Sequence, residues 1–135
     1  MDLATIHSVI VDAWLALDLG LPTEYENMPL SPTPQNAPWA RLFWLPVEND
    51  EKLQTADKYS GILQIDLIVP AGKGTADLHE YANQVTDFFL PFRLFTSGSV
   101  SLRVLGRTPS SVRVGGGWAT LTVSVRMSTV LDRVF

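Results

Sequence analysis

Cysteine is absent from the sequence, which excludes disulfide bonds, thiol nucleophiles and thiolate metal sites. Only two histidines are present, His7 and His79, and neither belongs to the HxxxH or HExxH spacing that zinc ligands on a helix require. No apolar run approaches the roughly 20 residues of a membrane-spanning helix. The first residues carry an acid and no basic cluster, so we expect no secretory signal and synthesis in a cytoplasm. We therefore expect no cofactor, no metal and no membrane partner.

The composition is that of one folded domain over residues 1–135. The chain has a mass of 14.9 kDa, with 46% hydrophobic and 18% charged residues. These values argue against disorder, a coiled coil or a collagen-like repeat. A chain of this length buries roughly two thirds of the surface that it exposes when unfolded, so one hydrophobic core is sufficient.

Apolar residues at offsets of three and four predict two amphipathic helices, over residues 3–17 and 75–90. Gly20 follows the first of them closely, as is typical of a helix end. Thr75 is placed to cap the first turn of the second helix, and Pro91 closes it. Each helix has one apolar face, so we expect both to pack on a sheet.

Four further stretches predict strands. The clearest spans residues 118–130, where apolar residues alternate with Thr, Ser and Arg, as in a half-buried antiparallel strand. The others span residues 39–45, 59–69 and 99–105, and residues 108–117 are the expected connection between the last two strands. The predicted fold is α+β, with a mainly antiparallel sheet of four or more strands packed by two helices. The expected order is helix, two strands, helix, two strands.

The net charge of −4 conceals an uneven distribution along the chain. Residues 1–90 contain 13 acidic and 4 basic side chains, whereas residues 91–135 contain 1 acidic and 6 basic ones, so the two parts carry −9 and +5. The basic residues of the second part are all arginine: Arg93, Arg103, Arg107, Arg113, Arg126 and Arg133. Arginine favours interfaces, because its planar guanidinium pairs with carboxylates through two hydrogen bonds.

The arginines have three possible roles. They pair with acids of the same chain on a solvated face, or the arginines of one copy meet the carboxylates of another. A nucleic-acid track is the weakest interpretation, because no aromatic residues interleave with the arginines.

The sequence contains no complete catalytic motif. Residues 70–75 (PAGKGT) lack the GxxxxGK[ST] spacing of a phosphate-binding loop, so we interpret them as a tight turn between a strand and a helix. Asp66 lies within an apolar strand and needs a partner, for which an arginine across the sheet is the simplest choice. The alternative is a small enzyme or ligand-binding domain whose site lies around Asp66 and His79. The favoured interpretation is that the protein is not an enzyme.

Two tryptophans of one predicted strand, Trp39 and Trp44, have opposite parity, so they cannot both point into the same core. One of them must face a helix, a loop or another subunit. An exposed tryptophan near arginine is typical of a binding hot spot, which makes Trp39 a candidate interface residue. Helices on both faces of the sheet would explain the parity equally well.

Several short motifs together resemble one protein family. They are Pro-Trp-Ala-Arg at residues 38–41, Gly-Ile-Leu-Gln-Ile-Asp at residues 61–66, Pro-x-Gly-x-Gly at residues 70–74 and Gly-Trp at residues 117–118. With the N-terminal helix and the proline-rich stretch after it, they are similar to the tail terminator, or tail completion, proteins of long-tailed bacteriophages. The resemblance covers nearly the whole chain up to Met127.

This resemblance implies a non-enzymatic virion protein at the junction of head and tail. Such proteins assemble as a hexameric ring on the last ring of the tail tube, stop its polymerisation and present the opposite face to the connector of the head. The implied partners are further copies of the chain, the tail tube protein and the head completion or connector protein. Phage DNA is only a passenger through the lumen. Another head-tail joining protein is the alternative within the virion.

A closed ring needs two different patches on each copy that complement each other. The polar, acidic stretch over residues 47–58 is expected to reach a neighbouring copy, and the arginines to face a subunit or the lumen. The candidate interface residues are Arg103, Arg107, Arg113, Arg126, Trp39, Glu48, Asp50 and Glu51.

Overall fold

The computed structural model describes residues 3–25, 30, 37–47, 60–72, 75–97 and 100–130. Within these residues the chain forms two helices and one sheet of seven strands, which is an α+β fold. The helices are α1 (Leu3–Leu17) and α2 (Ala76–Phe88). The strands are β1 (Thr23–Glu24), β2 (Trp39–Val47), β3 (Ser60–Pro70), β4 (Leu94–Ser97), β5 (Val100–Pro109), β6 (Arg113–Gly115) and β7 (Trp118–Val130).

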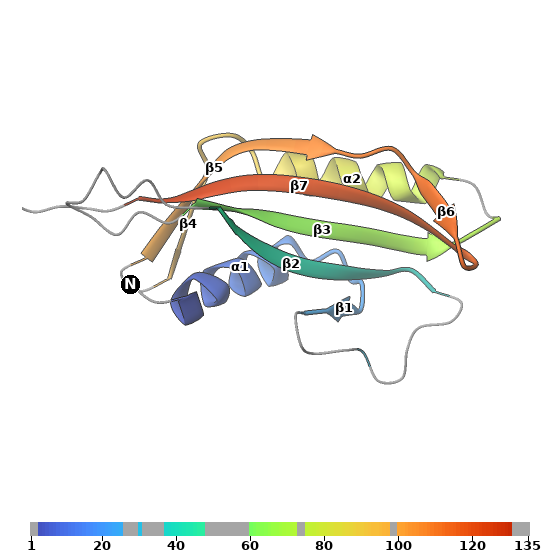
Figure 1. The fold of residues 1–135 in the computed structure, drawn as a ribbon, viewed down its shortest axis with the longest axis horizontal. Helices are drawn as coiled ribbons and strands as arrows, with labels where there is room; N and C mark the ends of the chain where they lie inside the picture. Colours follow the sequence, from blue (N-terminus) through green and yellow to red (C-terminus); the bar gives the residue numbers. More distant parts are fainter. Residues whose placement is uncertain are drawn as a thin grey trace, which may run out of the picture.

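Six strands follow one another across the sheet in the order β1-β2-β3-β7-β5-β4, and β6 pairs with the start of β7. The two longest strands, β3 and β7, run side by side through the middle of the molecule (Figure 1). They pair antiparallel, from Ser60 opposite Ser128 to Pro70 opposite Trp118. Of the described pairings, that of β1 with β2 is parallel and the others are antiparallel. The sheet is therefore mixed but mainly antiparallel.

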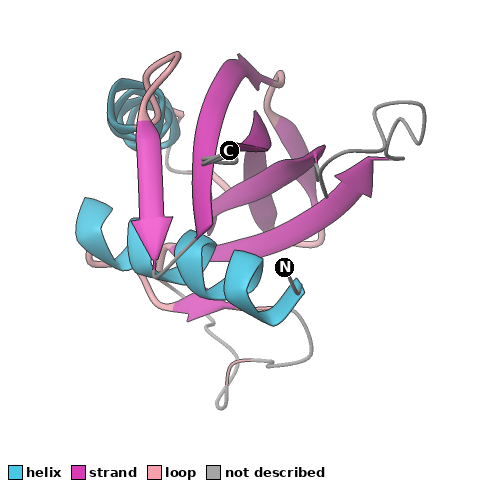
Figure 2. Cartoon of the chain, turned by 90° about the vertical axis from the view of Figure 1, so that its left-hand side faces the viewer, coloured by secondary structure: helices cyan, strands magenta, loops and turns pink. Residues whose placement is uncertain are grey.

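Both helices contribute to one hydrophobic core against the strongly curled sheet (Figure 2). The alternate residues of β7 that were expected to face the core are all buried: Ala119, Leu121, Val123, Val125 and Met127. They share the core with the apolar faces of α1 and α2, which include Ile6, Ile10, Leu78 and Val85. The period of two in β7 and the period of 3.6 in the helices therefore identified the buried faces correctly.

Three short strands and the length of β5 differ from the prediction. With two to four residues each, β1, β4 and β6 are too short to display an alternating pattern. The segment before β1 is held to β2 because the Ala40 N–H donates to the Pro22 carbonyl at 2.9 Å. Strand β5 continues to Pro109 after a bulge between Val104 and Gly106. Strand pairing therefore covers part of the stretch 108–117 that was expected to be a connection.

The helix ends also differ in detail from the prediction. The residue directly after α1, Asp18, has the left-handed φ of 54°, and Gly20 (φ 74°) comes two residues later. Aspartate tolerates this conformation better than most residues. Thr75 occupies the N-cap of α2, but its side chain forms no capping hydrogen bond, which corrects its predicted role. Neither described helix has the length and apolar character needed to cross a membrane.

Candidate functional site

The face of the sheet that turns away from the two helices is here called the outer face. It carries most of the arginines that were predicted to be interface residues. Side chains at alternate positions of a strand share a face. The strand register puts Arg103 opposite Ser128 and Arg113 opposite Thr120, on the same side of β7 as Arg126. Three of the four candidate arginines therefore lie on one face of the sheet.

Asp66 is the centre of a polar network on the outer face. Its carboxylate accepts hydrogen bonds from Arg41 Nη2 at 3.1 Å, Thr122 Oγ1 at 2.7 Å and Gln64 Nε2 at 3.3 Å. Arg113 Nη2 in turn donates to Thr122 Oγ1 at 2.8 Å. Asp66 is only 3% exposed, and its three donors compensate for the loss of water. The predicted pairing of Asp66 with an arginine across the sheet is confirmed, and the partner is Arg41.

The fold does not assemble the alternative site around Asp66 and His79. Asp66 lies on the outer face, whereas α2, which carries the exposed His79, packs on the other face. The sheet separates the two side chains, and both carboxylate oxygens of Asp66 are already hydrogen-bonded. Asp66 therefore connects β2, β3 and β7. No group of three His, Asp or Glu side chains suited to a metal ion occurs in the described residues.

The exposed positive charge of the outer face comes from Arg103, Arg113 and Arg126. Within the described part of the chain none of these three forms an ion pair. The guanidinium of Arg126 lies over the backbone of Gly106, where a Cβ atom would approach its Nη2 to 3.2 Å. All three side chains are exposed to solvent. The predicted acidic partners Glu48, Asp50 and Glu51 lie outside the described residues.

The fourth candidate, Arg107, lies on the helix side of the sheet. Arg103 and Arg107 have the same parity, but the bulge between Val104 and Gly106 adds one residue and reverses the face. Arg107 Nη1 donates to the carbonyl of Thr86 at 2.8 Å, near the C-terminal end of α2. The structure therefore separates Arg107 from the other three arginines. The sequence did not reveal this, because a bulge depends on pairing with a distant strand.

Trp39 is buried instead of exposed, with 8% of its surface accessible. It packs edge to face against Trp118, with ring centroids 6.1 Å apart, and the guanidinium of Arg41 lies 5.5 Å from its ring centroid. Its Nε1 is buried and has no hydrogen-bond partner. Trp44 packs against the core and lies over Gly61. The two tryptophans thus face opposite sides, as their parity indicated, but Trp39 forms no exposed anchor.

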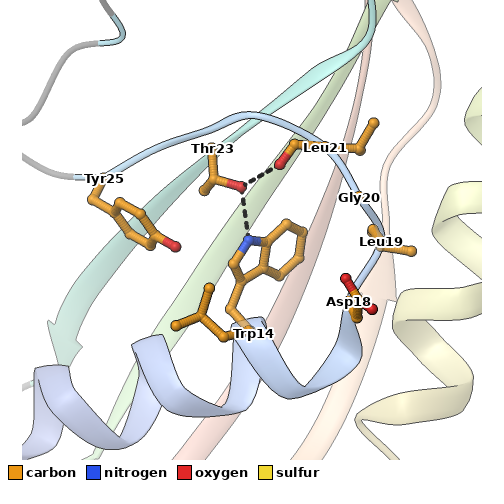
Figure 3. A pocket seen from close by; sticks show the side chains of 8 residues that line it. Trp14, Asp18, Leu19, Gly20, Leu21, Thr23 and Tyr25 are labelled. Atoms are coloured by element: carbon orange, nitrogen blue, oxygen red, sulfur yellow. Dashed lines mark hydrogen bonds between the residues drawn. The ribbon is translucent and has the colours of Figure 1, made fainter.

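The sequence analysis missed a cavity at the C-terminal end of α1 (Figure 3). Its volume is about 260 Å³, and its lining residues are Trp14, Leu15, Asp18, Leu19, Gly20, Leu21, Thr23 and Tyr25. Trp14 Nε1 donates to Thr23 Oγ1 at 2.8 Å, and this hydroxyl donates to the Leu21 carbonyl at 3.0 Å. Burial raises the pKa of the Tyr25 hydroxyl above its ordinary value. The hint in the sequence was Leu15, an apolar residue outside the apolar face of the predicted helix.

Comparison with known proteins found a matching family model and matching solved structures. Residues 5–127 match a family model whose description is phage tail terminator protein. One of the matching solved structures has a TM-score of 0.79 and 19% sequence identity, and the alignment covers 99% of each chain. At this identity the structural match shows a shared fold alone. No match was found among the curated proteins.

Proposed function

Because the chain belongs to the phage tail terminator protein family, as the match over residues 5–127 shows, we propose that it forms a hexameric ring that caps the tail tube. In this role it stops polymerisation of the tube and joins the tail to the head connector. The family identifies the protein as a structural component of the phage tail. The ring, its six copies and the contact with the connector are the proposal.

The structural observation that carries the proposal is the exposed positive charge on the outer face. Arg103, Arg113 and Arg126 are exposed and form no ion pair with the described residues. Thirteen of the 14 acidic residues precede residue 91. A closed ring uses two different patches on each copy, and surfaces of opposite sign suit such a contact because they steer and orient the partners.

We place the acidic segment 47–58 of one copy against the outer face of the next. Arg107 and Trp39 were candidates for the same contact. Arg107 is hydrogen-bonded to the Thr86 carbonyl near the end of α2, and Trp39 is buried. The proposed contact therefore rests on the three exposed arginines of the outer face and on the acidic residues Glu48, Asp50 and Glu51.

The proposal is tested by the mass of the assembly and by its effect on tails. We expect a particle of six copies by light scattering, either in free solution or recovered from tail ends. Tails assembled without the protein should grow beyond their normal length in electron micrographs, and added protein should restore the length. A protein that stays monomeric and leaves tail length unchanged would contradict the proposal.

The position in the particle separates a tail terminator from another head-tail joining protein. We expect a gold-labelled chain to mark the head-proximal end of tails that have not yet joined a head. A label that appears only on heads without tails would identify a joining protein of the head side instead.

A further inference from the structure

The cavity at the end of α1 offers a partner a surface that is part apolar and part polar. Two of its polar side chains are hydrogen-bonded, because Trp14 Nε1 donates to Thr23 Oγ1 and this hydroxyl donates to the Leu21 carbonyl. Leu15 lines the cavity although 61% of its surface is exposed. The exposed Asp18 also lines the cavity (Figure 3). A cavity of this kind suits an apolar group that has a positive charge next to it.

Phe92 has an unusual combination of backbone strain and exposure. Its φ of 68° is in the left-handed region, and 74% of its surface is accessible. The backbone is held in place because the Phe92 N–H donates to the Val104 carbonyl at 2.7 Å and the Val104 N–H donates to the Arg93 carbonyl at 2.9 Å. The neighbouring Leu90 and Leu94 are also exposed. Strain of this kind persists at sites where a function requires the conformation.

The cavity and Phe92 lie at opposite ends of the strand order. The cavity includes Thr23 of β1, the first strand across the sheet, whereas Phe92 directly precedes β4, the last. Figure 1 shows β1 and the connection from α2 to β4 well apart. A contact between these two places on different copies is heterologous, which is the kind of contact that closes a ring.

The cavity also matches Phe92 in size and the neighbouring Arg93 in charge. An apolar cavity of roughly 150 Å³ is large enough for benzene, so a volume of about 260 Å³ is sufficient for a phenyl ring. Arg93, next to Phe92, is exposed and lies over the Phe88 ring while its Nη1 donates to the Phe88 carbonyl, which leaves its other N–H groups for a partner. Asp18 in the cavity forms no ion pair with the described residues. The positive charge therefore accompanies Phe92 and the negative charge accompanies the cavity.

We infer that Phe92 of one copy inserts into the Trp14–Tyr25 cavity of the next copy, with Arg93 facing Asp18. This inference rests on the proposed ring, and it identifies a second contact between copies besides that of the outer-face arginines. The partner is a second copy of this chain.

The test uses two variants that each remove one side of the contact. Phe92→Gly removes the side chain and relieves the strain of the left-handed backbone conformation, because glycine adopts positive φ freely. Leu15→Arg places a positive charge in the cavity at an already exposed helical position, where arginine is well tolerated. By sedimentation velocity, each variant alone should self-associate with a dissociation constant at least roughly tenfold above that of the wild type.

A mixture of the two variants provides the sharper measurement. Phe92→Gly keeps an intact cavity and Leu15→Arg keeps Phe92, so together they should form a 1:1 heterodimer that does not grow further. Val114→Ser is the control, because Val114 is apolar and 71% exposed on β6, away from both surfaces. This control should assemble like the wild type. If copies associate only on a tail end, tail capping replaces sedimentation, and both variants, alone or mixed, should fail to cap.

Two results would overturn the inference alone: wild-type assembly or capping by either variant, or no heterodimer in a mixture at concentrations where the wild type assembles. A wild type that neither associates nor caps tails contradicts the proposed function itself, and the inference fails with it. The two failures are therefore distinguishable in one set of measurements.

Discussion

At the scale of single residues, the two described non-glycine residues with positive φ both belong to the inferred contact between copies. Asp18 (φ 54°) lines the cavity, and Phe92 (φ 68°) is its inferred occupant. A strained backbone conformation costs about 1–3 kcal/mol, and the cost is greater for a bulky side chain than for aspartate. The hydrogen bonds with Val104 hold Phe92 in this conformation.

Gly61 is required by the tryptophan on the neighbouring strand. A Cβ atom at this position would overlap the indole of Trp44. We therefore expect Gly61→Ala to lower the free energy of unfolding by about 1–3 kcal/mol, measured by urea denaturation. Gly115→Ala is the matched control, because a Cβ there meets open space, and its effect should stay within about 0.5 kcal/mol. Equal stability of the two variants would show that Trp44 moves aside freely.

At the scale of secondary-structure elements, helix α2 is held at its C-terminal end by two arginines. Thr75 provides no side-chain cap. At the other end, Arg93 Nη1 donates to the Phe88 carbonyl at 2.7 Å and Arg107 Nη1 to the Thr86 carbonyl at 2.8 Å. Positive charge at this end also interacts favourably with the helix dipole. Arg107 of β5 therefore holds the end of helix α2, because the bulge in β5 turns the Arg107 side chain to the helix side of the sheet.

Removing this arginine should weaken the fold without affecting the outer face. We expect Arg107→Met, which keeps the length of the side chain, to lower the free energy of unfolding by about 1 kcal/mol, because it removes the donor and the charge. Arg103→Met is the control, since Arg103 is exposed on the same strand and makes no hydrogen bond within the described residues. Both are measured by urea denaturation, and equal stabilities would contradict the assigned role of Arg107.

At the scale of the whole molecule, charge is divided unevenly between the two parts of the chain. Arg41 and Asp66 form an ion pair between the strands. The other arginines of the outer face have no such partner among the described residues. The outer face therefore carries exposed positive charge although the net charge of the chain is −4, which suits assembly through contacts between opposite charges.

Arg126 tests this division of charge. We expect Arg126→Gln to weaken association between copies about tenfold, which corresponds to about 1.4 kcal/mol. The free energy of unfolding should change by less than about 0.5 kcal/mol. Gln84→Glu on the exposed side of α2 changes the net charge equally and should leave association unchanged. Sedimentation velocity at two salt concentrations measures both, and an equal effect of the two variants would assign the change to net charge alone.

The sequence by itself determined the two helices, the long strands and their buried faces. The apolar alternation of residues 118–130 and the helical periodicity of residues 3–17 follow from the fixed geometry of strand and helix, so they are readable without a partner. The need of Asp66 for a charged partner was equally visible, because a buried carboxylate requires donors wherever it lies. Membership of the tail terminator family was also evident from short motifs along the chain.

Only the tertiary structure decided how the candidate residues are grouped. The bulge after Val104 moved Arg107 away from Arg103, the neighbouring Trp118 and Arg41 buried Trp39, and the segment after α1 folded back onto Trp14 to form a cavity. The first two features depend on strand pairing between distant parts of the chain, and the third depends on how the chain turns after α1. Local periodicity carries no information about them, because it reports the geometry of one element and not the register or the distance between two.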